Sequence, residues 1–98
     1  MASYELSILT PQGETFSGPV EFLLISGQLG ELGVLANHAP VIVALKKGIL
    51  KLRNEAGEKF FSHESGVLEV KPNHNVLVLV DDAAPATGIS SGKATSAH

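Results

Sequence analysis

The sequence predicts an all-β domain, an antiparallel β-sandwich of about nine or ten strands followed by a disordered C-terminal tail. Two observations lead to this prediction. Short apolar runs recur along residues 1–84 at a spacing of about 8 to 12 residues, with Gly, Pro and Asn between them, as in sandwiches and barrels. In addition, no ten-residue window before residue 82 has the period of an amphipathic helix.

The first half of the chain contains five predicted strands, over 4–9, 14–17, 20–25, 32–35 and 41–45. The second of them is expected to end at Gly18–Pro19, because glycine and proline interrupt β-ladders. The last is the continuous apolar run Val41–Leu45, which is typical of a strand buried on both faces.

The second half contains four more predicted strands, over 48–53, 58–63, 66–70 and 75–80. Asn54–Gly57 has the composition of a hairpin loop. Of the neighbours Phe60 and Phe61, one must point outward, because successive side chains of a strand alternate between its faces. His63 is expected to point outward as well, and His74 to cap a turn.

The composition divides the chain into a sandwich domain over 1–84 and a flexible tail over 85–98. The tail consists mainly of Ala, Ser, Thr and Gly, with Ile89 as its one large apolar residue, so it buries too little to offset its ordering entropy. The first residues carry neither the basic region nor the apolar core of a signal or transit peptide, and no apolar run approaches the roughly 20 residues of a membrane span.

Several classes of function fit the composition poorly. The net charge of −3 disfavours a nucleic-acid partner, and the five aromatic residues are few for stacking platforms. The chain has no cysteine, which excludes thiolate metal sites. His38, His63, Glu64 and His74 lack the spacing of a metal-ligand set, so a cupin-like metal enzyme is disfavoured and no cofactor is expected.

Four segments in order resemble one family, the epsilon subunit of F-type ATP synthases. Residues 27–40 read GQLGELGVLANHAP, similar to the G-E-(L/F)-G-(V/I) and H-A-P elements of that family. The remaining segments are LTPQGE with FSG over 9–18, LKKGIL over 45–50 and GVLEVKPN over 66–73. The resemblance covers residues 4 to 84 and departs from the family at Leu29, Asn37 and Ser65. Asn37 stands where glycine is common, and asparagine tolerates a left-handed backbone.

The resemblance implies a non-catalytic subunit of the central stalk. Such a subunit holds the gamma subunit and rests on the polar loops of the membrane c-ring, so that ion-driven rotation of the ring is coupled to ATP synthesis elsewhere. It associates with the membrane only through its partners. The expected location is the cytoplasmic face of a bacterial inner membrane, with the stromal or matrix side of an organelle as the alternative.

The resemblance also implies which residues face the ring, and it leaves the gamma-facing residues unassigned. Glu31 can form ion pairs with basic residues of the ring loops, and His38 can donate or accept a hydrogen bond. The six expected ring contacts are Gly30, Glu31, Leu32, His38, Ala39 and Pro40.

Members of the family usually continue from Asp81–Ala84 into two helices. Here Pro85 and Gly88 oppose a helix, so we expect a sandwich without the helical hairpin that inhibits ATP hydrolysis in longer relatives. The alternative reading is a free-standing β-sandwich that binds a carbohydrate or a peptide. That reading needs exposed aromatic residues, in which the chain is poor.

Overall fold

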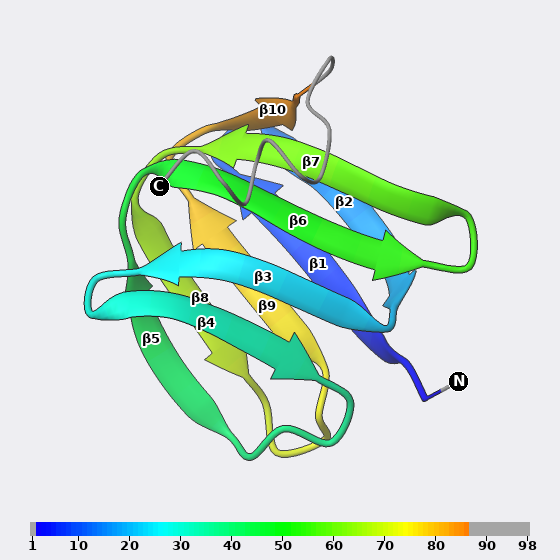
Figure 1. The fold of residues 1–98 in the computed structure, drawn as a ribbon. Helices are drawn as coiled ribbons and strands as arrows, with labels where there is room; N and C mark the ends of the chain where they lie inside the picture. Colours follow the sequence, from blue (N-terminus) through cyan, green and yellow to red (C-terminus); the bar gives the residue numbers. More distant parts are fainter. Residues whose placement is uncertain (1, 87–98) are drawn as a thin grey trace.

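The computed structural model describes residues 2–86, and the predicted tail beyond Ala86 lies outside the described residues (Figure 1). This part of the chain contains ten strands and no helix. The strands are β1 (Tyr4–Thr10), β2 (Gly13–Val20), β3 (Phe22–Gly27), β4 (Gly30–Leu35), β5 (Val41–Leu45), β6 (Gly48–Asn54), β7 (Gly57–His63), β8 (Gly66–Val70), β9 (Val76–Val80) and β10 (Ala83–Pro85).

The strands form two packed layers (Figure 1). One layer has the order β4-β3-β6-β7-β10, and the other has the order β5-β8-β9-β1-β2. Neighbouring strands are antiparallel with one exception, the parallel pair β1–β9. The prediction of a β-sandwich with about nine or ten strands is therefore confirmed.

The core lies between the layers and is built by the alternation of each strand. In β1, for example, Leu6 and Ile8 are fully buried while Glu5 points to solvent. Burying one such side chain contributes about 1.5–3 kcal/mol relative to exposure. Both layers supply the largest fully buried side chains, among them Leu6, Ile8, Leu23, Ile25, Leu45, Leu50, Leu52 and Leu68.

The two layers are joined at a corner where Gly27 of β3 pairs with Leu45 of β5. A Cβ atom on Gly27 would lie 3.0 Å from the carbonyl oxygen of Gly30 and 3.3 Å from Cγ1 of Val43. Glycine is therefore required for the close approach of the chains at this corner.

One predicted strand boundary is wrong, and one strand, β10, was not predicted. The second strand does not end at Gly18–Pro19: β2 continues to Val20, with Pro19 opposite Glu5. Since β2 is an edge strand, Pro19 needs no N–H group for a second neighbour. At the other end of the chain, β10 pairs with β7 and includes Pro85, one residue beyond the predicted domain boundary.

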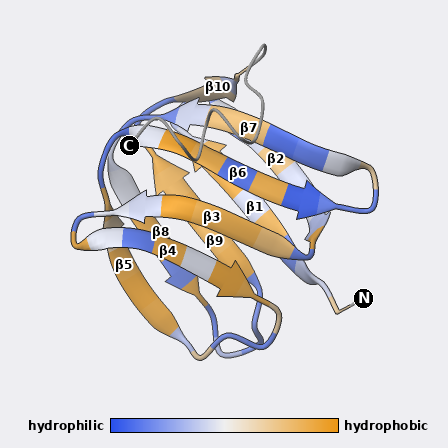
Figure 2. Cartoon of the chain, viewed as in Figure 1, coloured by the Kyte–Doolittle hydropathy of each residue, from blue (hydrophilic) through white to orange (hydrophobic). Residues whose placement is uncertain are grey.

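The prediction that Val41–Leu45 is buried on both faces is also wrong. Only Leu45 is fully buried, whereas Val41 is 36% and Ile42 70% exposed. Ile42 and Ala44 point to the outer face of β5, which nothing in the described part of the chain covers, whereas Val41 lies opposite the buried Val70 at the start of the strand. The ribbon of β5 is hydrophobic along most of its length (Figure 2), so its apolar outer side chains are left in solvent.

Candidate partner-binding surfaces

The six predicted ring contacts lie along one border of the sandwich. Gly30, Glu31 and Leu32 begin β4, directly after the two-residue turn that joins it to β3. His38, Ala39 and Pro40 lie in the loop after β4, at its opposite end. At a rise of about 3.3 Å per residue, β4 separates the two groups by roughly 13 Å or more. They form one elongated border instead of one compact cluster, and all except Leu32 and His38 are exposed.

The loop that carries His38 is held by local hydrogen bonds. The His38 N–H donates to the carbonyl of Leu35 at 3.3 Å, and Nδ1 of His38 lies 2.7 Å from the carbonyl oxygen of Ala39. Asn37 has a φ of 67°, the left-handed conformation that was expected for this position. These contacts fix the direction in which the loop presents His38.

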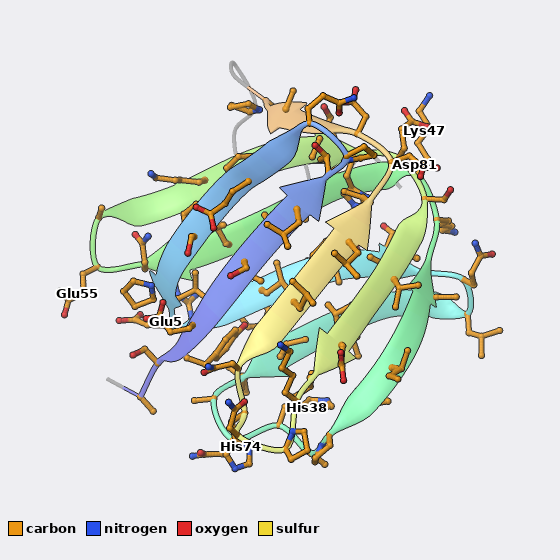
Figure 3. The ribbon with its side chains drawn as sticks, turned by 180° about the vertical axis from the view of Figure 1, so that it is seen from behind. Glu5, His38, Lys47, Glu55, His74 and Asp81 are labelled. Carbon is orange, nitrogen blue, oxygen red and sulfur yellow. The ribbon has the colours of Figure 1, made fainter. Side chains whose placement is uncertain are left out.

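A second histidine lies beside this loop. Nδ1 of His74 is 3.3 Å from the carbonyl oxygen of His38, and Figure 3 shows both residues at the same end of the molecule. His74 has a φ of 71°, and its N–H donates to the carbonyl of Lys71 at 2.8 Å. His74 therefore closes the turn through its main chain, whereas its side chain, which was predicted to cap the turn, contacts the neighbouring loop of His38.

The outer face of the layer that contains β5, β8, β9 and β1 is apolar (Figure 3). Two rows cross it. Ala44, Val67, Leu79 and Leu9 lie opposite one another along the first row, and Ile42, Glu69, Leu77 and Ser7 along the second. Ile42 is 70%, Leu79 45% and Val67 38% exposed. We name this surface the aliphatic face, defined by Leu9, Ile42, Ala44, Val67, Leu77 and Leu79.

Glu69 is the one charged residue in these two rows, and its carboxylate is half-buried. No ion pair of Glu69 is present among the described residues. Contiguous exposed apolar surface with a polar rim is typical of sites that bind other proteins. A lone carboxylate within it suits a partner that supplies a basic side chain.

The outer face of the other layer differs, because charged and aromatic side chains contact one another there, although Leu35 and Ile49 of the same layer are exposed at 59% and 46%. The guanidinium of Arg53 lies 5.4 Å from the ring centroid of Phe22, a cation–π contact. Nζ of Lys51 lies 3.7 Å from a carboxylate oxygen of Glu58. We name this surface the paired face, defined by Phe22, Leu24, Lys51, Arg53, Glu58 and Phe60. Phe60 lies on this face and Phe61 is buried, which confirms that the two aromatic neighbours point to opposite sides.

A pocket of about 350 Å³ lies at the border between β4 and β5. Leu32 and Val43 line it from the two strands, and Glu31 is its one charged lining residue. The pocket lies next to the predicted ring contacts at the start of β4. Its lining therefore belongs to the same border of the sandwich.

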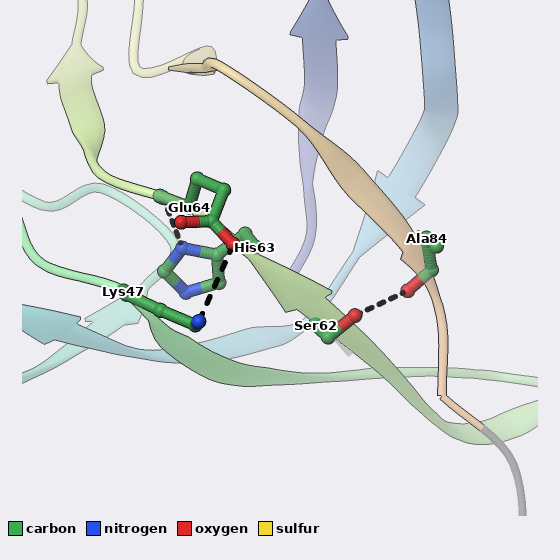
Figure 4. A network of polar contacts seen from close by, with 5 residues as sticks. All are labelled: Lys47, Ser62, His63, Glu64 and Ala84. Atoms are coloured by element: carbon green, nitrogen blue, oxygen red, sulfur yellow. Dashed lines mark hydrogen bonds and ion pairs between the residues drawn. The ribbon is translucent and has the colours of Figure 1, made fainter.

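His63 does not point outward as predicted: it is 3% exposed and faces the core on the same side of β7 as Phe61. Its Nδ1 lies 2.9 Å from the carbonyl oxygen of Glu64, and the nearby ion pair joins Lys47 to the Glu64 carboxylate at 3.7 Å (Figure 4). Because a carbonyl only accepts, Nδ1 carries the proton. His63 is thus a buried side chain at the end of β7, whereas His38 lies in the loop after β4.

A buried hydrogen bond joins the two layers close to the predicted border. The hydroxyl of Tyr4 in β1 donates to the carbonyl of Val34 in β4 at 2.8 Å. Burial raises the pKa of the Tyr4 hydroxyl, because the phenolate would lose its hydration. The bond fixes β4, and with it the border that carries the six predicted ring contacts, relative to the opposite layer.

Within residues 2–86, no group of three or more His, Cys, Asp or Glu side chains is placed to hold a metal ion. No helix of the described part is long and apolar enough to cross a membrane. The features that remain are surfaces: the aliphatic face and the β4 border. They are typical of a β-sandwich that binds other proteins.

Comparison with known proteins gives the family. The model of the ATP synthase delta/epsilon chain β-sandwich domain matches residues 3–86. The chain belongs to this family, and the resemblance found in the sequence is confirmed.

Two solved structures are similar in fold. A chain of the mitochondrial ATP synthase of Euglena gracilis, from a structure of OSCP, F1 and the c-ring, is 26% identical with a TM-score of 0.82. The match covers 99% of the present chain and 62% of the Euglena chain, so the present chain spans less than two thirds of that relative. A chain from the central stalk and c-ring of the Tetrahymena thermophila enzyme has a TM-score of 0.70 at 18% identity, over 93% and 76% of the two chains, and supports the fold alone.

Proposed function

We propose that this chain is a non-catalytic central-stalk subunit of an F-type ATP synthase that couples rotation of the c-ring to the gamma subunit. The observation that carries the proposal is the aliphatic face on a sandwich of the delta/epsilon family. A family fold alone does not define a role, but an exposed apolar surface that spans four strands is typical of a site that another protein covers.

In this proposal the gamma subunit covers the aliphatic face. Four strands present its side chains from one rigid layer, so a partner can bury them without distortion of the fold. A stable contact of this kind buries at least about 1,000 Å² in total. Glu69 would pair with a basic side chain of gamma and fix the register of the contact.

The β4 border would rest on the polar loops of the c-ring. Glu31 supplies a carboxylate at one end of this border, and His38 supplies an imidazole at the other. An elongated border suits a broad ring surface better than a compact cluster does, because it contacts more than one ring loop at a time. The chain would reach the membrane only through these partners, on the bacterial cytoplasmic side or on the stromal or matrix side of an organelle.

Torque transmission demands a rigid body between two partners. One elementary charge that crosses about 100 mV releases about 2.3 kcal/mol, so the contacts must hold against several such steps. The sandwich is suited to this load, because the ladders of both layers and the buried bond from Tyr4 to Val34 resist shear. The chain itself needs no catalytic group for this role.

The experiment measures binding of the chain to purified gamma by calorimetry, and then binding to membranes that carry the c-ring. Glu31→Ala and His38→Ala are compared with the unaltered chain. The proposal predicts tight binding to gamma for all three proteins and weaker binding to ring-bearing membranes for the two variants. Failure of the folded, unaltered chain to bind gamma would contradict the proposal.

A further inference from the structure

β4 is a strand with one free edge. It pairs with β3 alone among the strands of the described chain, although β5 follows it after a short loop and runs back along the same border (Figure 1). A free edge presents N–H and C=O groups that another strand can use.

Hydrogen bonds and register identify the β4 residues whose main-chain groups point to this edge. The carbonyl of Ser26 accepts the N–H of Lys46 at 3.2 Å, so the main chain of Ser26 turns away from β4. In an antiparallel ladder, the N–H and C=O groups of two opposite residues either both point toward the partner strand or both point away from it. Glu31 lies opposite Ser26 and therefore turns outward, and so do Gly33 and Leu35 at the alternate positions.

The edge of β2, at the opposite border of the sheet, shows how a protected edge is built in the same molecule. β2 contains a register shift opposite Ile8 and Leu9, and it carries Pro19, which lacks an N–H group. Bulges and prolines are common devices that prevent pairing at an edge. β4 has a regular register from Gly30 to Leu35 and no proline, so its edge has neither device.

The space beside β4 has a definite chemical character. The pocket of about 350 Å³ between β4 and β5 exposes the side chains of Leu32 and Val43. Its one charged lining group is Glu31, and no basic residue lines it. The pocket therefore suits an apolar side chain of a bound segment, and Glu31 suits a basic side chain next to it.

We propose that the β4 edge receives an extended segment of the c-ring partner as an added strand, with a basic side chain of that segment opposite Glu31. The inference rests on the proposed function and specifies its mode of contact, through the main chain as well as through side chains. The available groups are the N–H groups of Glu31, Gly33 and Leu35 and the carbonyls of Glu31 and Gly33, because the Leu35 carbonyl already accepts from His38.

A matched pair of variants at Gly33 separates the main-chain contact from side-chain effects. Gly33→Ala adds a Cβ atom 3.3 Å from the Phe22 ring and retains the N–H. Gly33→Pro adds a similar Cβ atom but removes the N–H that points to the free edge, and the ladder to β3 keeps its hydrogen bonds. Against c-ring purified in detergent, Gly33→Ala should bind within about twofold of the unaltered chain, and Gly33→Pro about three- to tenfold more weakly.

Amide hydrogen exchange by NMR gives a second readout that does not depend on substitution. In the free chain the amides of Glu31, Gly33 and Leu35 should exchange fast and those of Leu32 and Val34 slowly. Bound to the ring, the three fast amides should slow at least about tenfold, while the outward amides of β2 stay unchanged. This readout also decides the case if Gly33→Pro fails to fold.

The outcomes distinguish the inference from the function on which it rests. A complex in which the Glu31, Gly33 and Leu35 amides exchange as in the free chain overturns the inference alone, because the ring is then held by side chains. Binding to gamma without any binding to the ring overturns the inference together with the proposed ring contact.

Discussion

The two outer faces of the sandwich are built from the same kind of strand and differ in how their side chains are satisfied. On the paired face, Arg53 covers Phe22 and Lys51 pairs with Glu58. On the aliphatic face, Ile42 and Leu79 stand in solvent at 70% and 45% exposure. Leu35 and Ile49 of the layer with the paired face are exposed as well, at 59% and 46%, so the contrast lies in the charged contacts, which a partner would have to break on the paired face and need not break on the aliphatic face.

The aliphatic face and the β4 border are connected through the same core. The layer with the aliphatic face also contains β1, whose Tyr4 holds β4 through Val34. The proposed gamma-binding surface and the proposed ring-facing border are thus connected by a buried hydrogen bond, and force on one is carried to the other through packed strands.

The largest expected effect on stability comes from Gly66→Ala, which breaks the layer of the aliphatic face. Gly66 begins β8 opposite Val80, and a Cβ atom there would overlap the backbone of Leu79 and Val80. Backbone cannot move aside as a side chain can, so we expect a loss of about 3 kcal/mol or more in the free energy of unfolding, measured in urea. Gly33→Ala is the control for loss of a glycine, because Gly33 has no left-handed φ and its added Cβ atom meets only the side chain of Phe22, at 3.3 Å. Equal losses at the two positions would contradict this explanation.

A smaller effect is expected from Tyr4→Phe, which removes the bond between the layers. The loss of the hydroxyl should lower the free energy of unfolding by about 1–2 kcal/mol at pH 8. Burial raises the pKa of Tyr4 above its unfolded value of about 10. The contribution of the neutral Tyr4 hydroxyl to the free energy of unfolding is therefore fully present below pH 10, and it is lost as the pH rises toward the pKa of the folded state.

The chain has one tyrosine, so its ionisation can be followed by absorbance without interference. Urea unfolding between about pH 8 and 11 should show a decline for the unaltered chain that is absent in Tyr4→Phe. A decline of the same size in both proteins would assign the alkaline loss to lysines instead of Tyr4.

The smallest effect is expected from Arg53→Ala on the paired face. The substitution removes a cation–π contact at an exposed site, which is worth about 0.5–1 kcal/mol of stability. Binding to gamma should not change, because we propose that gamma covers the aliphatic face on the opposite side of the sandwich. Thermal unfolding measures the loss of stability, and calorimetry measures the binding to gamma. A loss of affinity for gamma would show that the paired face also contacts that subunit.

Much of the fold follows from the sequence because strand alternation is local. The alternation of Tyr4 to Leu9 and the turn after it are read from neighbouring residues alone. The burial of Val41–Leu45 could not be predicted, because an apolar run occurs both in a strand buried on two faces and in a strand whose outer face binds another protein. The sequence alone does not distinguish the two. His63 was misjudged because a polar residue was assumed to point outward.

The site divides in the same way. The six residues of the β4 border could be proposed as ring contacts from the family resemblance, because they all lie in one continuous segment, residues 30–40. The aliphatic face could not, because Ala44, Val67 and Leu79 come from different strands. Only the strand order and the register place them side by side, and these depend on contacts distant in sequence.

Placing the same charge on each outer face tests whether gamma binds the aliphatic face. Leu79 on the aliphatic face and Ile49 on the other outer surface are matched in exposure, at 45% and 46%. Binding of Leu79→Glu and Ile49→Glu to purified gamma is measured by calorimetry, with thermal unfolding as the check of the fold. Leu79→Glu should weaken binding at least about 30-fold, while Ile49→Glu should stay within about twofold of the unaltered chain. Equal affinities of the two variants, or a loss confined to Ile49→Glu, would contradict the assignment of gamma to the aliphatic face.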